Sequence, residues 1–208
     1  MEQRSAAWFQ ARLGKLTASR MSTAMDFLKT GKESKARYDY KVQLVAERMT
    51  DVIAEHFVTP AMRWGIETEP AAKAAYEMEA GDLIAPMGFY DHPSIDYCGA
   101  SPDGGLPARD DLGPGLIETK CPTTATHINW MLHGAVPTEH KPQMILQCAC
   151  TGRKWVEFVS YDPRMPEARR LFVRRFVPTA EEIETIEAAA RTFLAEVEAM
   201  FDAVKEAA

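Results

Sequence analysis

Two short motifs carry residue types suited to metal-dependent chemistry: Ser101-Pro102-Asp103 and Glu118-Thr119-Lys120. Asp103 and Glu118 are separated by 14 residues, and their carboxylate oxygens are hard ligands of the kind that Mg²⁺ or Mn²⁺ prefers. An ion held by two carboxylates polarises a phosphoryl oxygen and acidifies a bound water. Lys120 would orient or deprotonate that water and offset charge in the transition state. The two motifs therefore predict a divalent-metal centre.

This centre requires that the two motifs lie side by side. Residues 116–121 are expected to form a strand, and its period-two alternation places Glu118 and Lys120 on one face. Residues 95–100 are expected to form a preceding strand that ends just before Asp103. If these strands are neighbours, Asp103 and Glu118 can share one ion. Each motif alone also has a structural interpretation, because Pro-Asp-Gly is a common turn and a strand Glu and Lys two apart often form a surface pair.

The remaining pattern predicts an α/β fold, a mixed sheet flanked by helices, in a single domain over residues 1–208. Helices are expected at 7–13, from 17 or 19 to about 29, and at 38–56, 60–79, 124–133, 142–152 and after the capping box at Thr179. Strands are expected at 87–90, 95–100, 116–121, 155–161 and 171–177. Residues 30–37 are polar and basic and are expected to form a mobile loop. Pro70 is expected to kink the helix at 60–79 or to begin a new helical segment.

The net charge of −6 argues against a nucleic-acid partner at first sight, but the charge is unevenly distributed. Residues 179–208 hold eight acidic and two basic side chains and so account for all six negative charges. Residues 1–50 hold ten basic and five acidic side chains. A basic first quarter with an acidic final helix is compatible with local contact to phosphates, although a mixture of solvated charges has the same composition.

The sequence has no apolar stretch of about 20 residues, the length of a membrane-spanning helix, and its first residues lack the apolar run of a signal peptide. A cytoplasmic protein without a membrane partner is expected. The cysteines are expected to be reduced thiols, and their spacing matches no C-x-x-C or iron–sulfur pattern, so no iron–sulfur cluster is expected. These cysteines are Cys98, Cys121, Cys148 and Cys150.

Several segments resemble one family in order and approximate spacing. The P-D followed by (D/E)-x-K arrangement is that of the PD-(D/E)xK nuclease superfamily, with a restriction-endonuclease-like core. Within it, the chain resembles the bacteriophage lambda exonuclease family, also described as the YqaJ-type viral recombinase family, and a prophage alkaline exonuclease is the expected kind of relative. The matching segments are Trp8 to Gly14, Thr17-Ala18-Ser19, Trp64-Gly65 with Glu69, Ser101 to Gly104, Glu118 to Pro122 and Tyr161 to Arg164.

The resemblance implies roles for individual residues. Asp103 and Glu118 would bind Mg²⁺, for which Mn²⁺ can substitute, together with the Thr119 backbone carbonyl, and Lys120 would be the catalytic lysine. Glu69 matches a further carboxylate near the metal, with Glu67 as the alternative. Gln143 matches a glutamine beside the centre. Gln147 is expected one turn later on the same helix face, with a helix-surface amide as its commoner interpretation. The residues matching a pocket for the 5′-phosphate of the cut strand are Arg12, Ser19 and Ser101.

The activity that this resemblance implies is 5′ to 3′ digestion of one strand of linear double-stranded DNA to mononucleotides. The remaining 3′ single-stranded overhang would serve recombination by strand annealing. The implied partners are double-stranded DNA ends, a single-strand annealing protein and two further copies of the chain in a homotrimeric ring. Two other functions remain open: an endonuclease or junction resolvase with the same metal centre, and a non-catalytic protein that binds DNA ends.

Overall fold

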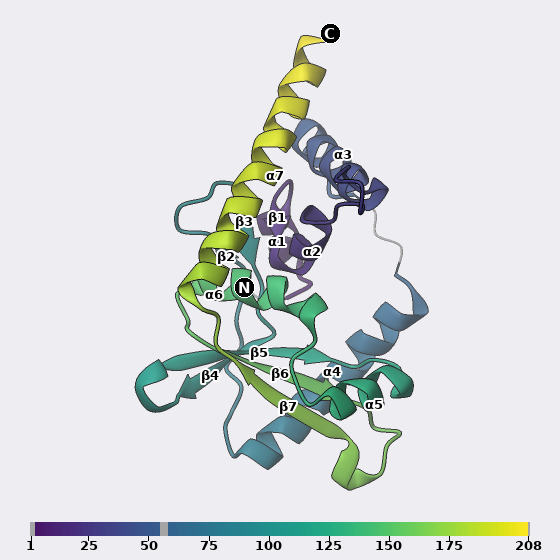
Figure 1. The fold of residues 1–208 in the computed structure, drawn as a ribbon, viewed down its shortest axis with the longest axis vertical. Coiled ribbons are helices and arrows are strands. Elements are labelled where there is room, and N and C mark those ends of the chain that lie inside the picture. Colours follow the sequence, from purple (N-terminus) through teal and green to yellow (C-terminus); the bar gives the residue numbers. More distant parts are fainter. Residues whose placement is uncertain (1–2, 55–57, 208) are drawn as a thin grey trace.

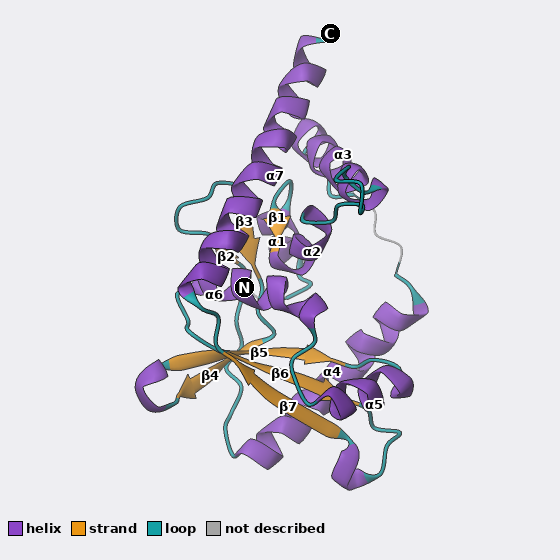
Figure 2. Ribbon diagram, viewed as in Figure 1, coloured by secondary structure: helices purple, strands orange, loops and turns teal. Residues whose placement is uncertain are grey.

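The computed structural model describes residues 3–54 and 58–207. Helices and strands are mixed along the chain, as predicted (Figures 1 and 2). The helices are α1 (Ala6–Arg12), α2 (Met21–Ala24), α3 (Lys35–Thr50), α4 (Pro60–Ala80), α5 (Thr124–His133), α6 (Lys141–Thr151) and α7 (Ala180–Glu206). The strands are β1 (Leu16–Thr17), β2 (Tyr90–Asp91), β3 (Cys98–Ala100), β4 (Gly104–Ala108), β5 (Pro114–Lys120), β6 (Val156–Tyr161) and β7 (Leu171–Phe176).

The larger sheet has the strand order β4-β5-β6-β7, in which β5 and β6 are parallel and the other neighbours are antiparallel. Helix α4 contacts β5, β6 and β7 and covers one face, where Tyr76 packs in a cluster with Ile117 and Val159. Helices α5 and α6 lie on the other face, where the Trp130 ring of α5 meets Phe158 edge-on. The alternation of β5 therefore sends Ile117 towards α4 and Glu118 towards α6.

The smaller sheet, of order β1-β3-β2, lies beside α6. Its strands contribute Leu16 and Cys98 to the main core, which also contains Leu44 from α3, Leu146 from α6 and Phe193 from α7. Helices α3 and α7 run side by side at one end of the molecule, and α7 extends from there towards the larger sheet (Figure 1). The core thus joins the basic N-terminal segments to the acidic final helix.

The first fifty residues differ from the sequence-based expectation in two ways. The predicted helix to about residue 29 is a 3-10 turn at Ala18–Arg20 followed by the single turn α2, and the chain then reverses through Gly31, with Phe27 bridged to Glu33. The predicted loop at 30–37 is cut short because Ser34 caps α3 and Lys35 already begins it. Helix α3 ends at Thr50, where Asp51 has a φ of 55°. Part of the predicted helix end, residues 55–57, lies outside the described residues.

Other comparisons with the prediction concern helix α4, the start of β3 and the strand β4. Pro70 lies inside the continuous helix α4. Strand β3 begins later than expected because Tyr97 has a φ of 55°, a left-handed conformation that interrupts a strand. Strand β4 was not predicted, since its sequence Gly-Gly-Leu-Pro-Ala is poor in strand-forming residues. The capping box at Thr179 and Glu182 is confirmed. No described helix has the length and apolarity to cross a membrane.

Candidate active site

Asp103 lies at the start of β4, immediately before Gly104, which pairs with Ile117 of β5. The strand expected before Asp103 is β3, and it does not neighbour β5, because it pairs with β1 and β2 in the smaller sheet. The unpredicted β4 makes the connection instead. The Thr119 backbone N–H donates to Asp103 Oδ2 at 2.7 Å. The two predicted motifs are therefore in direct contact, and the contact is made by the residue that follows Glu118.

The carboxylate of Glu118 is the most densely bonded group of the site, and its residue is only 1% exposed. Gln143 Nε2 donates to its Oε1 and Gln147 Nε2 to its Oε2, both at 2.6 Å. Lys120 Nζ also donates to Oε1 and lies 3.3 Å from Gln143 Oε1. Gln147 is therefore not a surface amide: it is fully buried, because α6 places two amides one turn apart against the same carboxylate.

Charges within the site shift its pKa values. Burial raises the pKa of Asp103, and the negative charges of Glu118 and Glu69 raise it further, to about 8. Burial by itself would lower the pKa of Lys120, but attraction to Glu118 and Asp103 outweighs it and raises that pKa. The site therefore keeps a protonated amine beside a cluster of carboxyl groups whose mutual repulsion is not fully neutralised.

Glu69 is held at the edge of this cluster by two cations. Arg4 Nη2 lies 2.9 Å from its Oε2 and Lys73 Nζ lies 2.7 Å from its Oε1. Lys73 also donates to the Asp103 backbone carbonyl at 2.6 Å, so it joins Glu69 to the metal motif. Glu67 is exposed. The structure thus places Glu69, rather than Glu67, beside Asp103.

The residues present suit a divalent ion with oxygen ligands. Among the described residues no three His, Cys, Asp or Glu side chains are placed to hold a metal together, so Asp103 and Glu118 would need help from a backbone oxygen such as the Thr119 carbonyl, and from water. Three donors already occupy Glu118, out of roughly four acceptor positions on a carboxylate, which leaves room for a metal. A cation would also relieve the repulsion that raises the pKa of Asp103.

The three residues predicted to hold a phosphate lie at or beside a pocket of about 340 Å³, which Arg12 and Ser19 line. Ser101 joins this pocket to the carboxylates, because its Oγ accepts from Trp8 Nε1 at 2.8 Å and from Arg12 Nη1 at 3.5 Å. The Arg12 guanidinium stacks 4.0 Å from the Trp8 ring, and burial lowers its pKa. Among the described residues, the Arg12 guanidinium makes one long hydrogen bond, to Ser101. Its remaining N–H donors are therefore available to a ligand in the pocket.

A glycine turn fixes the end of the helix that carries Arg12. Gly14 has a φ of +64°, and a Cβ at this position would lie 2.6 Å from Arg48 Cγ. Glu47 accepts from the Gly14 N–H at 2.9 Å, and Arg48 Nε donates to its carbonyl at 2.9 Å. Side chains of α3 therefore bond both the N–H and the carbonyl of Gly14.

Sequence reasoning left one contributor to the site open and missed another. For Gln147 a helix-surface amide was the commoner interpretation, although it was expected on the same helix face as Gln143. Lys73 was not considered, yet it follows Glu69 by four residues, the spacing at which helix side chains meet. That spacing was the available signal.

Comparison with known proteins agrees with this geometry. Residues 7–154 match the YqaJ-like viral recombinase domain. An alkaline exonuclease from Laribacter hongkongensis, LHK-Exo, superposes with a TM-score of 0.86 at 40% identity, covering 97% of each chain. The same values hold for LHK-Exo in complex with dAMP. A phage-related exonuclease from Haemophilus somnus shares the fold at 14% identity, with a TM-score of 0.64 over 93% of this chain and 96% of its own.

No curated protein sequence matches the chain. The family match nevertheless spans most of the chain and includes Arg12, Asp103, Glu118 and Lys120. Both the family and the solved structures point to nucleases that act on DNA. The chain therefore belongs to the YqaJ-like viral recombinase family and has its PD-(D/E)xK nuclease fold.

Proposed function

We propose that this protein is a Mg²⁺-dependent exonuclease that digests one strand of linear double-stranded DNA from its 5′ end to mononucleotides. The observation that carries the proposal is the joining of a cationic pocket to a carboxylate centre through the three residues Ser101, Pro102 and Asp103. A 5′-phosphate bound by Arg12 would set the next phosphodiester of the strand at the carboxylates. Each cut then releases one nucleotide and exposes a new 5′-phosphate.

The chain's own residues have separable tasks in this reaction. Asp103 and Glu118, with the Thr119 carbonyl, would hold Mg²⁺ or Mn²⁺, and Glu69 would be the further carboxylate beside the ion. When bound, this ion supplies charge stabilisation at the phosphoryl group and a more acidic water. Lys120 Nζ, fixed by Glu118 and Gln143, would orient the attacking water and offset charge on the phosphate. Gln143 and Gln147 orient the Glu118 carboxylate.

The pocket accounts for the proposed polarity. Arg12 offers a planar set of donors to a terminal phosphate, with Ser19 and Ser101 as hydroxyl partners. The dAMP in the LHK-Exo complex is a deoxynucleoside monophosphate, which is the kind of product that this reaction would release. A 3′ overhang is what remains after one strand has been removed from its 5′ end.

Family resemblance supports the wider proposal. We infer a homotrimeric ring that encloses the duplex, a single-strand annealing protein that receives the 3′ overhang, and a role in phage-type recombination in the cytoplasm of a host that carries the gene on a prophage. The acidic helix α7 would then face away from the DNA.

The test compares three substrates with and without Mg²⁺: a linear duplex with 5′-phosphate ends, the same duplex with 5′-hydroxyl ends, and a covalently closed circle. The proposal expects mononucleotides from the 5′-phosphorylated duplex, slower digestion from 5′-hydroxyl ends, and an intact circle. Rapid cutting of the circle would instead indicate an endonuclease or junction resolvase. Unchanged DNA in every reaction, with Lys120→Ala behaving like the parent, would indicate a protein that only binds DNA ends.

A further inference from the structure

Arg20 is a second cation of the pocket, next to Ser19 in the 3-10 turn that follows β1. Neither the metal motifs nor the 5′-phosphate residues proposed above include it. Its guanidinium stacks 4.4 Å from the ring of Tyr40, a residue only 3% exposed. Tyr40 in turn stacks on Phe193 of the main core, at 5.4 Å between ring centroids. The Arg20 side chain therefore rests on a rigid platform.

The Arg20 guanidinium has a buried donor without an acceptor among the described residues. Its Nε is buried and has no hydrogen-bond partner within residues 3–54 and 58–207. A buried donor left unpaired costs about 1–3 kcal/mol. The guanidinium also forms no ion pair with a carboxylate in that part of the chain, although the fork geometry suits one. This combination indicates an acceptor that comes from outside the protein.

The charge balance of the pocket supports an anion. Its basic lining residues are Arg4, Arg12, Lys15 and Arg20, and Glu47 is its acidic one. Arg4 pairs with Glu69 and Lys15 with Asp91, so these two cations are neutralised locally. Glu47 accepts from Gln43 and from the backbone N–H of Gly14 and Ala54. Arg12 and Arg20 remain as the cations without a carboxylate partner among the described residues.

The two guanidiniums belong to one pocket, which Arg12, Arg20 and Tyr40 all line. Arg20 lies over the ring of Tyr40, so both cations border the same space. A terminal phosphate monoester carries a charge of about −1.5 to −2 at neutral pH, whereas an internal diester carries one negative charge. Two unpaired guanidiniums therefore match a terminal monoester better than an internal phosphate.

We propose that Arg20 binds the 5′-terminal phosphate monoester together with Arg12, and so determines the preference for phosphorylated over hydroxyl 5′ ends. This inference rests on the proposed exonuclease function. It deepens that function by assigning the selectivity for the terminal dianion to a pair of arginines.

The test uses the full chain with Arg20→Gln, Arg20→Lys and the control Arg191→Gln. Arg191 is exposed on α7 and hydrogen-bonds Ser94, outside the pocket, so its change removes the same charge elsewhere. For Arg20→Gln, kcat/KM on 5′-phosphorylated ends should fall about 10- to 100-fold, and on 5′-hydroxyl ends by no more than about twofold. Arg20→Lys should give an intermediate loss, because it keeps the charge without the fork. Arg191→Gln should match the parent on both ends.

A binding measurement separates this inference from the proposed function. Calorimetric titration with dAMP should show weaker binding to Arg20→Gln than to the parent by a similar factor. If the parent neither digests DNA nor prefers phosphorylated ends, the proposed function fails before Arg20 is tested. If the parent shows that preference and Arg20→Gln keeps it, or loses activity equally on both ends, the role of Arg20 is refuted. Equal affinity of both proteins for dAMP would refute it as well.

Discussion

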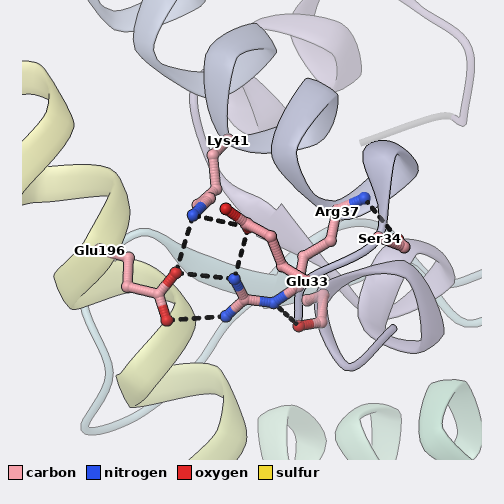
Figure 3. Close-up of polar contacts among 6 residues, drawn as sticks. Glu33, Ser34, Arg37, Lys41 and Glu196 are labelled. Carbon is pink, nitrogen blue, oxygen red and sulfur yellow. Dashed lines mark hydrogen bonds and ion pairs between the residues drawn. The ribbon is translucent and has the colours of Figure 1, made fainter. Parts of the chain in front are cut away.

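Helix α7 is tied to α3 by a charged cluster, and the cluster makes a quantitative prediction about stability (Figure 3). Arg37 of α3 has a side chain only 3% exposed and donates to both carboxylate oxygens of Glu196 on α7, at 2.7 and 2.8 Å. Lys41 Nζ lies 2.9 Å from Glu196 and 2.8 Å from Glu33. Arg37 Nε also donates to the Ala24 carbonyl at 2.8 Å. Removing the Glu196 charge should therefore leave two buried cations with one carboxylate.

The expected loss can be worked from the pKa of Glu196. The hydrogen bond from Arg37, together with Lys41, outweighs burial and lowers this pKa to about 2. One pKa unit corresponds to about 1.4 kcal/mol, so the lowering sets an upper limit of roughly 3 kcal/mol. The Glu196 side chain is 37% exposed, so solvent screening reduces this limit to about 2 kcal/mol. Glu196→Gln should lower the free energy of unfolding by that amount.

Urea denaturation and thermal unfolding measure this loss. A cost of about 2 kcal/mol corresponds to a fall of roughly 4–8 °C in Tm for a chain of this size. Glu184→Gln is the matched control: it makes the same change at an exposed site on the same helix, and it should cost less than about 0.5 kcal/mol.

The pH dependence gives a second measurement. Because the folded-state pKa of Glu196 is lowered, its stabilisation is present above the ordinary pKa of about 4.3 and is lost as the pH falls towards 2. The difference in stability between the parent and Glu196→Gln should therefore shrink from pH 5 to pH 2. Equal stabilities of Glu196→Gln and Glu184→Gln at pH 7, or a difference that persists at pH 2, would refute the reasoning.

Three further variants test the site. Lys120→Met should lower kcat about 10²- to 10⁴-fold in single-turnover digestion while leaving the circular dichroism spectrum unchanged; parental activity would remove Lys120 from the mechanism. Gln147→Leu deletes a donor to Glu118 and should raise the Mg²⁺ concentration for half-maximal rate about 10- to 100-fold, so an unchanged Mg²⁺ titration would contradict its orienting role. Gly14→Ala should lower the free energy of unfolding in urea by about 2–4 kcal/mol, more than Gly31→Ala does. Both glycines have a positive φ, but only at Gly14 would the added Cβ meet Arg48. Equal costs for the two variants would contradict this close approach.

The centre was predictable wherever local periodicity decides geometry. Alternation along β5 correctly placed Glu118 and Lys120 on one face, and helical spacing correctly placed Gln143 and Gln147 on one face of α6. The capping box at Thr179 was also readable, since it involves residues three apart. In each case the controlling contacts lie within one element.

The features that escaped prediction depend on contacts far apart in the sequence. Arg37 was expected in a mobile loop, but it is buried because its partner Glu196 follows 159 residues later. Strand β4 forms from weak strand formers because β5 provides a hydrogen-bonding edge for Gly104 and its neighbours. Because β4 was not predicted, the sequence could not show that the pairing of β4 with β5 brings Asp103 close to Glu118. Tertiary pairing overrides local propensity at both places.

The distance from the pocket to the carboxylates is fixed by the short segment 101–103. Ser101 Oγ accepts from Trp8 at 2.8 Å, and the Pro102 carbonyl accepts from Gln3 Nε2 at 2.7 Å. The Asp103 carbonyl accepts from Lys73 at 2.6 Å. Every residue of the segment is therefore held by a side chain from α4 or from the N-terminal segment that includes α1.

This bracing bears on why the reaction would remove one nucleotide at a time. In the proposed mechanism, cutting within a duplex would use Asp103, Glu118 and Lys120 without the 5′-phosphate pocket. An enzyme that measures from a 5′ end needs a fixed spacing between Arg12 and the carboxylates, because a displacement of about 1 Å at a reacting group can cost a hundredfold in rate. The hydrogen bonds on Ser101 and Asp103 would hold that spacing in the proposed reaction. The bracing of this segment thus favours a nuclease that works from DNA ends over one that cuts internally.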